Sequence, residues 1–267
     1  MEIIKAKSLI EDKYFTPRWM LIGDSGSGKT TSLTTWPKDQ RMLVFDFWGN
    51  KESLVGADNI DIVSYSTLDP TSMQSYAKAL ADQNELVMEL ESGECPYSVV
   101  VYDTLTGLGD CMLYYTLSMP KAGGGMLATG PGGSPSEIHF RTLSHLMGTF
   151  IKRLIAYPIP LIVIAHLQPL TNKKGDFLGY EAVVWGKKTR ATIFTYFSEV
   201  YRQFATPTDN EESVDKFGEQ PQEFFWQTKS DLDWPMLKSV INTRGEVFGR
   251  FIDPDFTSLL KRRGLIK

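Results

Sequence analysis

The sequence predicts an α/β fold with a mostly parallel β-sheet flanked by helices and with extra strands toward the C-terminus. Four short stretches are apolar throughout, as expected of strands that are buried on both faces: 19–22, 42–46, 97–103 and 161–165. Between them lie segments of helical periodicity, the clearest at about 71–91 and 134–157. Strands that alternate with helices in this way are typical of a parallel sheet covered on both faces.

The most specific motif lies between the first apolar stretch and a short predicted helix. Residues Gly23-Asp24-Ser25-Gly26-Ser27-Gly28-Lys29-Thr30 match G-x-x-x-x-G-K-[ST], the phosphate-binding P-loop. The glycines let backbone N–H groups turn toward the α- and β-phosphates, beside the positive end of the helix. Lys29 can reach the β- and γ-phosphates, Thr30 can coordinate Mg²⁺, and Thr31 completes the expected nucleotide site. The motif predicts binding of a nucleoside triphosphate, with ATP and Mg²⁺ as cofactors.

A carboxylate is expected to complete the metal site. Asp103 ends the apolar stretch 97–103, and an acid at the end of a buried strand after a P-loop is where the Walker B residue belongs. There it would hold the Mg²⁺ shell together with Thr30. The alternative is that Asp103 merely caps the helix that follows through Thr104-Leu105-Thr106.

Polar segments divide the rest of the chain. We expect a lead-in at 1–17 and one domain over 18–267, with a flexible insertion at 206–221. Residues 118–135 are rich in Gly and Pro and form one predicted loop, and 169–190 form a second, polar one. Ser134-Pro135-Ser136-Glu137 predicts a helix start with a capping box and proline at the first helical position. Weaker strands are expected at 60–65, 199–204, 223–227 and 240–242, and a terminal helix at 255–263.

Composition and charge restrict the partners and the cellular environment expected for this protein. The net charge of −4 gives no overall attraction to nucleic acid, so such binding would depend on local basic segments. Cys95 and Cys111 lack metal-ligand spacing, which favours a reducing environment. The longest apolar run, about 158–167, is too short to cross a bilayer, and the N-terminus does not look like a signal peptide. We therefore expect a soluble cytoplasmic protein, in the host cytoplasm if viral, with no membrane contact.

These motifs together resemble a known family. Residues 23–30, the stretch 99–103 followed by Thr104-Leu105-Thr106, and 161–166 followed by a basic segment resemble the RecA-type ATPase core. More closely, they resemble the phage-encoded RecA-like proteins of the AAA-type nucleotide-binding and single-strand annealing kind. The resemblance covers about 18–204, and more loosely the chain to 263. It implies a DNA-dependent ATPase in phage recombination or strand annealing, assembled as a ring or filament.

The resemblance also implies where single-stranded DNA would bind. RecA-type proteins hold DNA on the loops that correspond to 118–135 and 169–190. The second segment carries five cations and three aromatic residues, which suit phosphates and stacked bases. They are Lys173, Lys174, Lys187, Lys188 and Arg190, with Phe177, Tyr180 and Trp185 between them. The alternative is that the lysines form a solvated face and the aromatic residues belong to the core.

Further catalytic roles follow from the resemblance. His166 or Gln168, at a strand end facing the γ-phosphate, would sense the nucleotide state, although His166 is by itself an ordinary strand-end histidine. Lys238 or Arg244 would be supplied to a neighbouring subunit to stabilise the transferring phosphoryl group.

One position departs from the family. RecA-like ATPases usually carry a glutamate just beyond the second strand to activate the attacking water, and Trp48 stands about there. Because tryptophan cannot accept a proton, either Asp46 or Glu52 does this work or hydrolysis is slow.

Three other functions remain open. A packaging or helicase-type motor often has a glutamate directly after the Walker B aspartate, where this chain has Thr104. A P-loop kinase for a small molecule needs an arginine-rich lid, and 169–190 offers mainly lysines with the single Arg190. A non-catalytic, nucleotide-gated assembly factor is consistent with Trp48.

Overall fold

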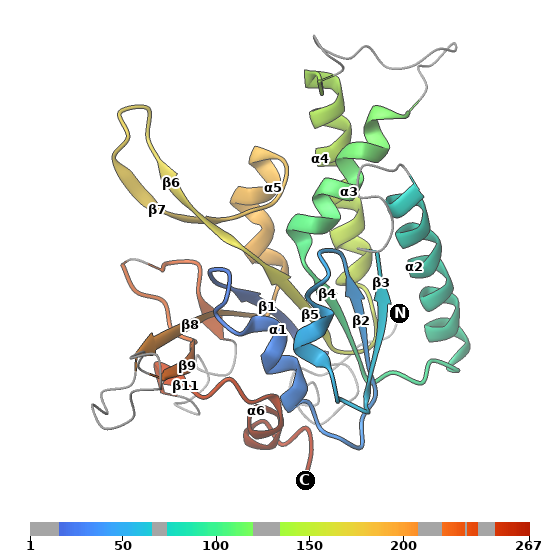
Figure 1. Cartoon of the computed structure of the whole chain (residues 1–267), viewed down its shortest axis with the longest axis vertical. Helices are drawn as coiled ribbons and strands as arrows, with labels where there is room; N and C mark the ends of the chain where they lie inside the picture. The colour runs from blue at the N-terminus through green and yellow to red at the C-terminus, as the bar shows by residue number, and fades with distance from the viewer. Residues whose placement is uncertain (1–15, 66–73, 120–133, 208–220, 233, 240–248) are drawn as a thin grey trace, which may run out of the picture.

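The computed structural model describes residues 16–65, 74–119, 134–207, 221–232, 234–239 and 249–267. These residues form an α/β fold around a nine-stranded sheet, in the order β11-β9-β8-β1-β5-β4-β2-β3, with β10 paired to β8 (Figure 1). The six strands from β8 to β3 are parallel, and β9, β10 and β11 are antiparallel additions. The predicted RecA-like P-loop fold with extra C-terminal strands is therefore confirmed.

The strands of this sheet are β1 (Arg18–Ile22), β2 (Met42–Asp46), β3 (Ile60–Ser64), β4 (Val99–Asp103), β5 (Leu161–Ala165), β8 (Glu199–Pro207), β9 (Gln222–Gln227), β10 (Lys238–Ser239) and β11 (Phe251–Ile252). The α-helices are α1 (Lys29–Ser32), α2 (Gln74–Ser92), α3 (Leu105–Leu117), α4 (Glu137–Leu154), α5 (Lys187–Thr192) and α6 (Phe256–Arg262). Short 3₁₀ helices are η2 (Leu33–Thr35), η3 (Asn50–Leu54) and η5 (Ile193–Tyr196).

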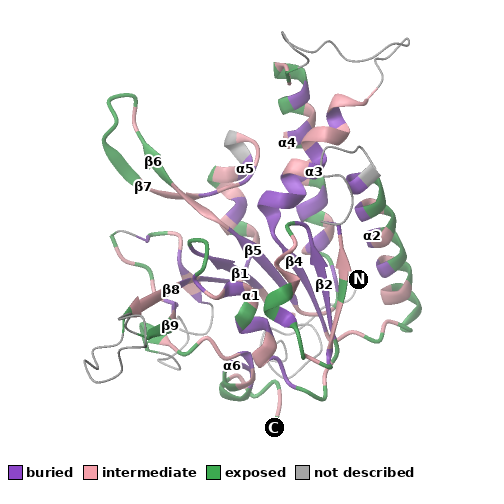
Figure 2. Ribbon diagram, in the orientation of Figure 1, coloured by how far each residue is buried: buried purple, intermediate pink, exposed green. Residues whose placement is uncertain are grey.

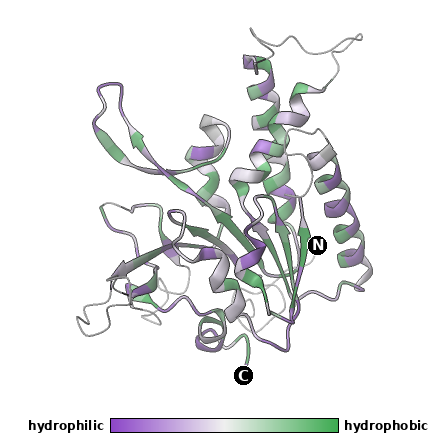
Figure 3. Cartoon of the chain, viewed as in Figure 1, coloured by the Kyte–Doolittle hydropathy of each residue, from purple (hydrophilic) through white to green (hydrophobic). Residues whose placement is uncertain are grey.

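The sheet buries both of its faces, which explains why its central strands are apolar throughout (Figures 2 and 3). Along β1, Met20 and Ile22 belong to the apolar cluster that includes side chains of α2, α3 and α4. Trp19 and Leu21 point the other way, into a cluster with side chains of η2 and α6. The alternation of side chains along a strand thus divides one apolar run between two cores.

The terminal helix α6 closes the second core. Its Phe256 packs edge-on against Trp19, Trp36 and Trp226, with ring centroids 4.8–5.7 Å apart. At its start, the backbone N–H of Phe256 donates to Thr35 Oγ1 over 2.9 Å, which joins α6 to the end of η2.

A buried ion pair ties the end of α6 to the sheet. Arg263 follows the helix and donates through Nη2 to Glu199 Oε1 of β8 over 2.5 Å. Both side chains are buried, at 2% and 0% exposed. Tyr201 also donates its hydroxyl to Glu199 Oε2 over 2.7 Å, so both carboxylate oxygens have partners.

The prediction of a second polar loop at 169–190 is wrong. Residues 167–182 form an antiparallel hairpin of β6 (Leu167–Thr171) and β7 (Phe177–Ala182), and α5 follows it. The polar side chains pair across the hairpin, since Gln168 donates to Glu181 over 2.7 Å. Figure 1 shows this hairpin projecting from the body of the protein beyond the end of β5.

Other boundaries differ in detail. Helix α4 is capped by Ser136 rather than Ser134, and His139 takes the place of the expected glutamate, since its Nδ1 accepts from the Ser136 N–H over 3.0 Å. Of the predicted loop at 118–135, the insertion at 206–221 and the lead-in at 1–17, the parts 120–133, 208–220 and 1–15 lie outside the described residues. The predicted strand 240–242 lies outside them entirely. In the part of the chain that the structure describes, no helix has the length and apolar character to span a membrane.

Candidate nucleotide-binding site

The P-loop connects the end of β1 to α1 at the carboxyl edge of the parallel sheet. Gly26 and Gly28 have φ angles of 77° and 82°, a region that favours glycine because it has no Cβ. At Gly23 the restriction is close packing, since a Cβ there would lie 2.2 Å from the backbone oxygen of Gln203. The three glycines are therefore required by the backbone path of the loop.

Lys29 lies inside the loop. Its Nζ donates to the backbone oxygens of Gly23 and Asp24 over 2.9 and 2.6 Å, and to Ser27 Oγ over 3.2 Å. Burial lowers the pKa of Lys29 to about 8, although the carboxylates of Asp103 and Asp24 oppose this shift. A buried cation held only by neutral oxygens and these two acids is a strong site for a polyphosphate anion.

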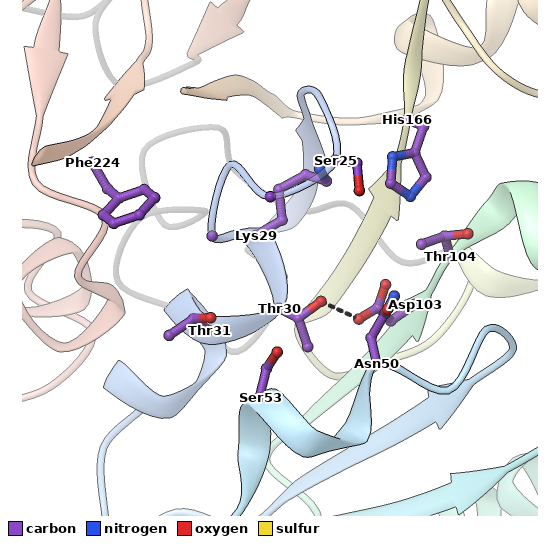
Figure 4. Close-up of a pocket in the computed structure, with 12 residues that line it drawn as sticks. Ser25, Lys29, Thr30, Thr31, Asn50, Ser53, Asp103, Thr104, His166 and Phe224 are labelled. Carbon is purple, nitrogen blue, oxygen red and sulfur yellow. Dashed lines mark hydrogen bonds between the residues drawn. The ribbon is translucent and has the colours of Figure 1, made fainter. Parts of the chain in front are cut away.

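Thr30 and Asp103 meet as the sequence predicts. Thr30 Oγ1 of α1 donates to Asp103 Oδ2 at the end of β4 over 2.6 Å (Figure 4). In the sheet, β5 separates β4 from β1, the strand that precedes the P-loop. Asp103 is 1% exposed, and its other oxygen, Oδ1, is buried without a hydrogen-bond partner among the described residues. Burial raises the pKa of Asp103 to about 6, against the hydrogen bond from Thr30.

This pair fits a magnesium ion. Mg²⁺ takes oxygen ligands and is usually held by one or two protein groups together with substrate phosphates. The Thr30 hydroxyl and the unpartnered Asp103 Oδ1 are such ligands, and they lie beside Lys29 in the same pocket. A bound Mg²⁺ would supply charge neutralisation to the phosphates of the nucleotide.

A pocket of about 330 Å³ joins these residues, within the range of small-molecule sites. It is lined by the predicted residues Ser25, Gly26, Gly28, Lys29, Thr30, Thr31, Asp103 and His166, and also by Asn50, Ser53, Thr104 and Phe224 (Figure 4). The last four were missed by the sequence analysis. Asn50 and Ser53 could have been suspected as polar residues just after the second strand, whereas no local motif marks Phe224.

His166 lines one side of this pocket, and Trp48 packs on the His166 ring. The Trp48 indole is 45% exposed and stacks on the His166 ring, and it also lies flat against α3. A Cβ on Gly107 of α3 would come within 2.4 Å of Trp48 Cδ1, so glycine is needed there. Burial, and then the charge of Lys29, lower the pKa of His166 to about 4, with Asp24 opposing. At neutral pH His166 is therefore an uncharged imidazole, and its buried Nε2 has no hydrogen-bond partner in the part of the chain that the structure describes.

Asp46 shapes the turn that carries Trp48. Its Oδ1 accepts the backbone N–H groups of Trp48, Gly49 and Asn50 over 3.2, 2.7 and 3.2 Å. Its Oδ2 accepts the Ser64 hydroxyl over 3.1 Å. Both oxygens are engaged and Asp46 does not line the pocket, so its observed role is to hold the turn.

The other predicted catalytic residues lie elsewhere. Glu52 is exposed on η3, where its neighbour Ser53 lines the pocket instead. Gln168 is hydrogen-bonded within the β6–β7 hairpin. Lys238 pairs with Val200 near the start of β8, at the opposite end of the strands from the P-loop. Arg244 lies outside the described residues.

Fold and site together define a P-loop NTPase. A protein-family model described as "AAA domain" matches residues 16–229, and the chain belongs to this family. The matched segment includes the P-loop, Asp103, His166 and Phe224. No curated protein matches the sequence. Among solved structures, the flagellar accessory protein FlaH from Methanocaldococcus jannaschii is similar at 8% identity with a TM-score of 0.38, over 88% of this chain and 83% of that chain.

Proposed function

We propose that the protein is an ATPase that binds Mg²⁺-ATP at the P-loop and couples its hydrolysis to single-stranded DNA, in recombination or strand annealing. The observation that carries the nucleotide part is the convergence of Lys29, Thr30 and Asp103 in one pocket. Lys29 would pair with the β- and γ-phosphates, while Thr30 and Asp103 would hold the metal ion. The backbone N–H groups of the loop would orient the phosphates.

Activation of the attacking water is the step of hydrolysis that this site is least equipped to perform. Asp103 is the only carboxylate among the described residues that line the pocket, and it is engaged by Thr30. The neutral His166 can orient a water through Nε2, but with a pKa of about 4 it is a weak base at neutral pH. We therefore expect slow basal hydrolysis that a partner accelerates.

The β6–β7 hairpin is the proposed DNA contact. Lys173 and Lys174 are at its tip, and Phe177 is 53% exposed beside them. These groups suit sequence-tolerant binding, in which cations neutralise phosphates and an aromatic face stacks a base. The loop 118–135, whose described ends adjoin α3 and α4, is the second proposed contact.

The other aromatic residues and the arginine of this segment have structural partners. Tyr180 stacks on Trp234 with ring centroids 4.2 Å apart. Trp185 donates to Asp110 over 3.1 Å. Arg190 is paired with Glu181 inside the base of the hairpin. These contacts favour the tip over the base as the DNA-binding part.

The hairpin is connected to the nucleotide site through the chain itself. His166 is the one residue between β5 and β6, and its backbone oxygen accepts the N–H of Val183 over 2.8 Å. The oxygen of Val183 in turn accepts the Thr106 hydroxyl of α3 over 2.8 Å. If DNA binding orders the hairpin, the position of His166 should therefore change with it.

The test is the ATPase rate with and without single-stranded DNA. We expect the double variant Lys173→Ala/Lys174→Ala to lose DNA stimulation, and its salt slope to fall by roughly 0.7 per cation removed. The matched control, Lys38→Ala/Lys261→Ala, removes the same charge from exposed sites outside the hairpin. Unchanged DNA binding by the hairpin variant across a salt titration would refute this contact. A phosphorylated small-molecule product would instead establish a kinase.

A nucleotide-gated assembly factor is the second candidate. It is favoured by Trp48, which stands about where the family has its catalytic acid. Such a protein would bind ATP and DNA together without turnover under any DNA condition. Single-turnover measurements with labelled ATP separate it from a slow ATPase.

We also propose that the protein acts as a homo-oligomer, a ring or a filament, in which a cation from one subunit completes the site of the next. Lys238 lies near Glu199, and burial lowers its pKa while Glu199 raises it. Because Lys238 is already placed near a carboxylate, Arg244 becomes the preferred candidate. Mixing Arg244→Ala with Lys29→Ala protein should restore some activity. Absence of rescue at every ratio, in a mixture shown to co-assemble, would refute shared sites.

A further inference from the structure

Phe224 reaches the P-loop from a distant part of the chain. It belongs to β9, opposite Ala205 of β8, and β8 in turn pairs with β1. The edge of its ring lies against the loop, since a Cβ on Gly28 would be 3.1 and 3.2 Å from Phe224 Cδ1 and Cε1. The side chain is nevertheless 37% exposed, so part of its ring stays accessible to a ligand. Figure 4 shows its ring turned toward the pocket, across the P-loop from His166.

A second hollow adjoins the phosphate pocket on this side. Its volume is about 190 Å³, and it shares Gly28, Thr31 and Phe224 with the phosphate pocket. Its remaining lining includes Pro254 and Gln203, and no charged side chain is among its lining residues. It therefore suits a flat, neutral group better than a phosphate, for which its lining supplies no cation.

The phosphate pocket and the second hollow adjoin each other in the same way as the phosphates and the base of a nucleotide. Lys29 and Asp103 mark the phosphate end, Thr31 lies between the hollows, and Phe224 with Pro254 marks the uncharged end. From this order we infer that the second hollow holds the nucleobase, which stacks on the face of Phe224. This inference rests on the nucleotide binding proposed above.

Gln203 supplies a polar group at the edge of the same hollow. Its Oε1 accepts the indole N–H of Trp226 over 2.9 Å in the buried sheet, which leaves its NH₂ as the donor available to the hollow. That nitrogen lies 3.0 Å from the position of a Cβ on Gly28. Every nucleobase carries hydrogen-bond acceptors at its edge, so this donor completes a base site without selecting one base.

The experiment compares two ligands that differ in the base. ATP carries phosphates and base, while inorganic tripolyphosphate carries the phosphates alone, and both are titrated with Mg²⁺ by calorimetry. Removing the stack in Phe224→Ala should weaken ATP binding by roughly tenfold to a hundredfold. Tripolyphosphate binding should stay within about twofold of wild type, because Lys29 and Thr30 are unchanged.

Two further variants keep the result interpretable. Phe224→Tyr retains the aromatic face and should bind ATP within about threefold of wild type. Phe251→Ala removes a phenylalanine that is 47% exposed on β11, the neighbour of β9, and should leave both ligands unaffected. A thermal melt of each variant establishes that the fold is retained.

The outcomes distinguish a failure of the proposed base site from a failure of the proposed nucleotide binding. ATP affinity of Phe224→Ala within twofold of wild type overturns the base site, and so does an equal loss of both ligands, which would mean that Phe224 merely supports the P-loop. Wild-type protein that binds neither ATP nor tripolyphosphate overturns the proposed nucleotide binding itself.

Discussion

The indole of Trp48 stacks on the imidazole of His166, with ring centroids 4.9 Å apart and planes inclined by 26°. The residue that stands about where the resemblance to RecA-like ATPases predicts a catalytic glutamate thus covers the residue expected to sense the γ-phosphate. His166 lines the pocket, whereas Trp48 is partly exposed to solvent. A change at the γ-phosphate is therefore expected to reach the indole through His166.

Trp48 should report nucleotide binding by fluorescence. The chain has six tryptophans, all of them in its described part, and Trp48 is the one whose side chain is exposed. We expect ATP to change the tryptophan emission of the wild type, and Trp48→Phe to lose most of that change while it still binds ATP. Trp185→Phe, which removes an indole packed on α3, is the control and should keep the change. A full response in Trp48→Phe would contradict the proposed coupling of Trp48 to the nucleotide through His166.

Lys29→Ala should abolish ATP binding or weaken it at least tenfold, because charge-assisted hydrogen bonds to phosphate contribute about 1.5–3 kcal/mol each. The apo fold should survive, since the ammonium is buried at a cost that its loop contacts only partly offset. Calorimetric titration and a thermal melt measure the two effects. If the purified variant binds and hydrolyses ATP like wild type, the P-loop assignment is wrong.

The lowered pKa of His166 predicts a specific acid sensitivity. Its folded-state pKa is about 4 and its unfolded value is 6.5, so between these values the unfolded chain binds more protons than the folded protein. The contribution of His166 to stability is therefore complete above about pH 6.5 and is lost as the pH falls toward 4. Urea unfolding at pH 7 and 4.5 should show a smaller loss for His166→Asn than for wild type. The control is His145→Asn, an exposed position on α4; equal losses in wild type and His166→Asn would contradict the shift.

The buried pair of Glu199 and Arg263 should be costly to break. Arg263→Met removes the buried cation that pairs with Glu199 Oε1, with an expected loss of about 3–5 kcal/mol in the free energy of unfolding. Adding Glu199→Gln should recover part of this loss. Arg141→Met breaks an ion pair with Glu137 that is about four-fifths exposed and should cost less than about 1 kcal/mol. Equal urea midpoints for the two arginine variants would contradict the difference.

The phosphate end of the site could be predicted because its residues are set by local sequence. The P-loop has a fixed spacing, and Asp103 ends a strand whose carboxyl edge must face the loop in a parallel sheet. Phe224 could not be predicted in this way, because its position depends on the order β9-β8-β1, which no short motif specifies. The hairpin was mistaken for a loop because its strands are stabilised by polar pairs such as Gln168 with Glu181, and these leave no apolar alternation to detect.

The packing of α6 has a consequence for synthesis of the chain. Thr35 at the end of η2 is synthesised 221 residues before Phe256, which closes the face of the sheet beside it. Trp36 therefore lacks its contact with Phe256 while that length of chain is made, and the family match ends at residue 229, before Phe256. A nascent chain long enough to show every sequence motif of the family would still expose this aromatic face. We expect such a chain to need α6, or a chaperone that covers the same aromatic face, to avoid aggregation.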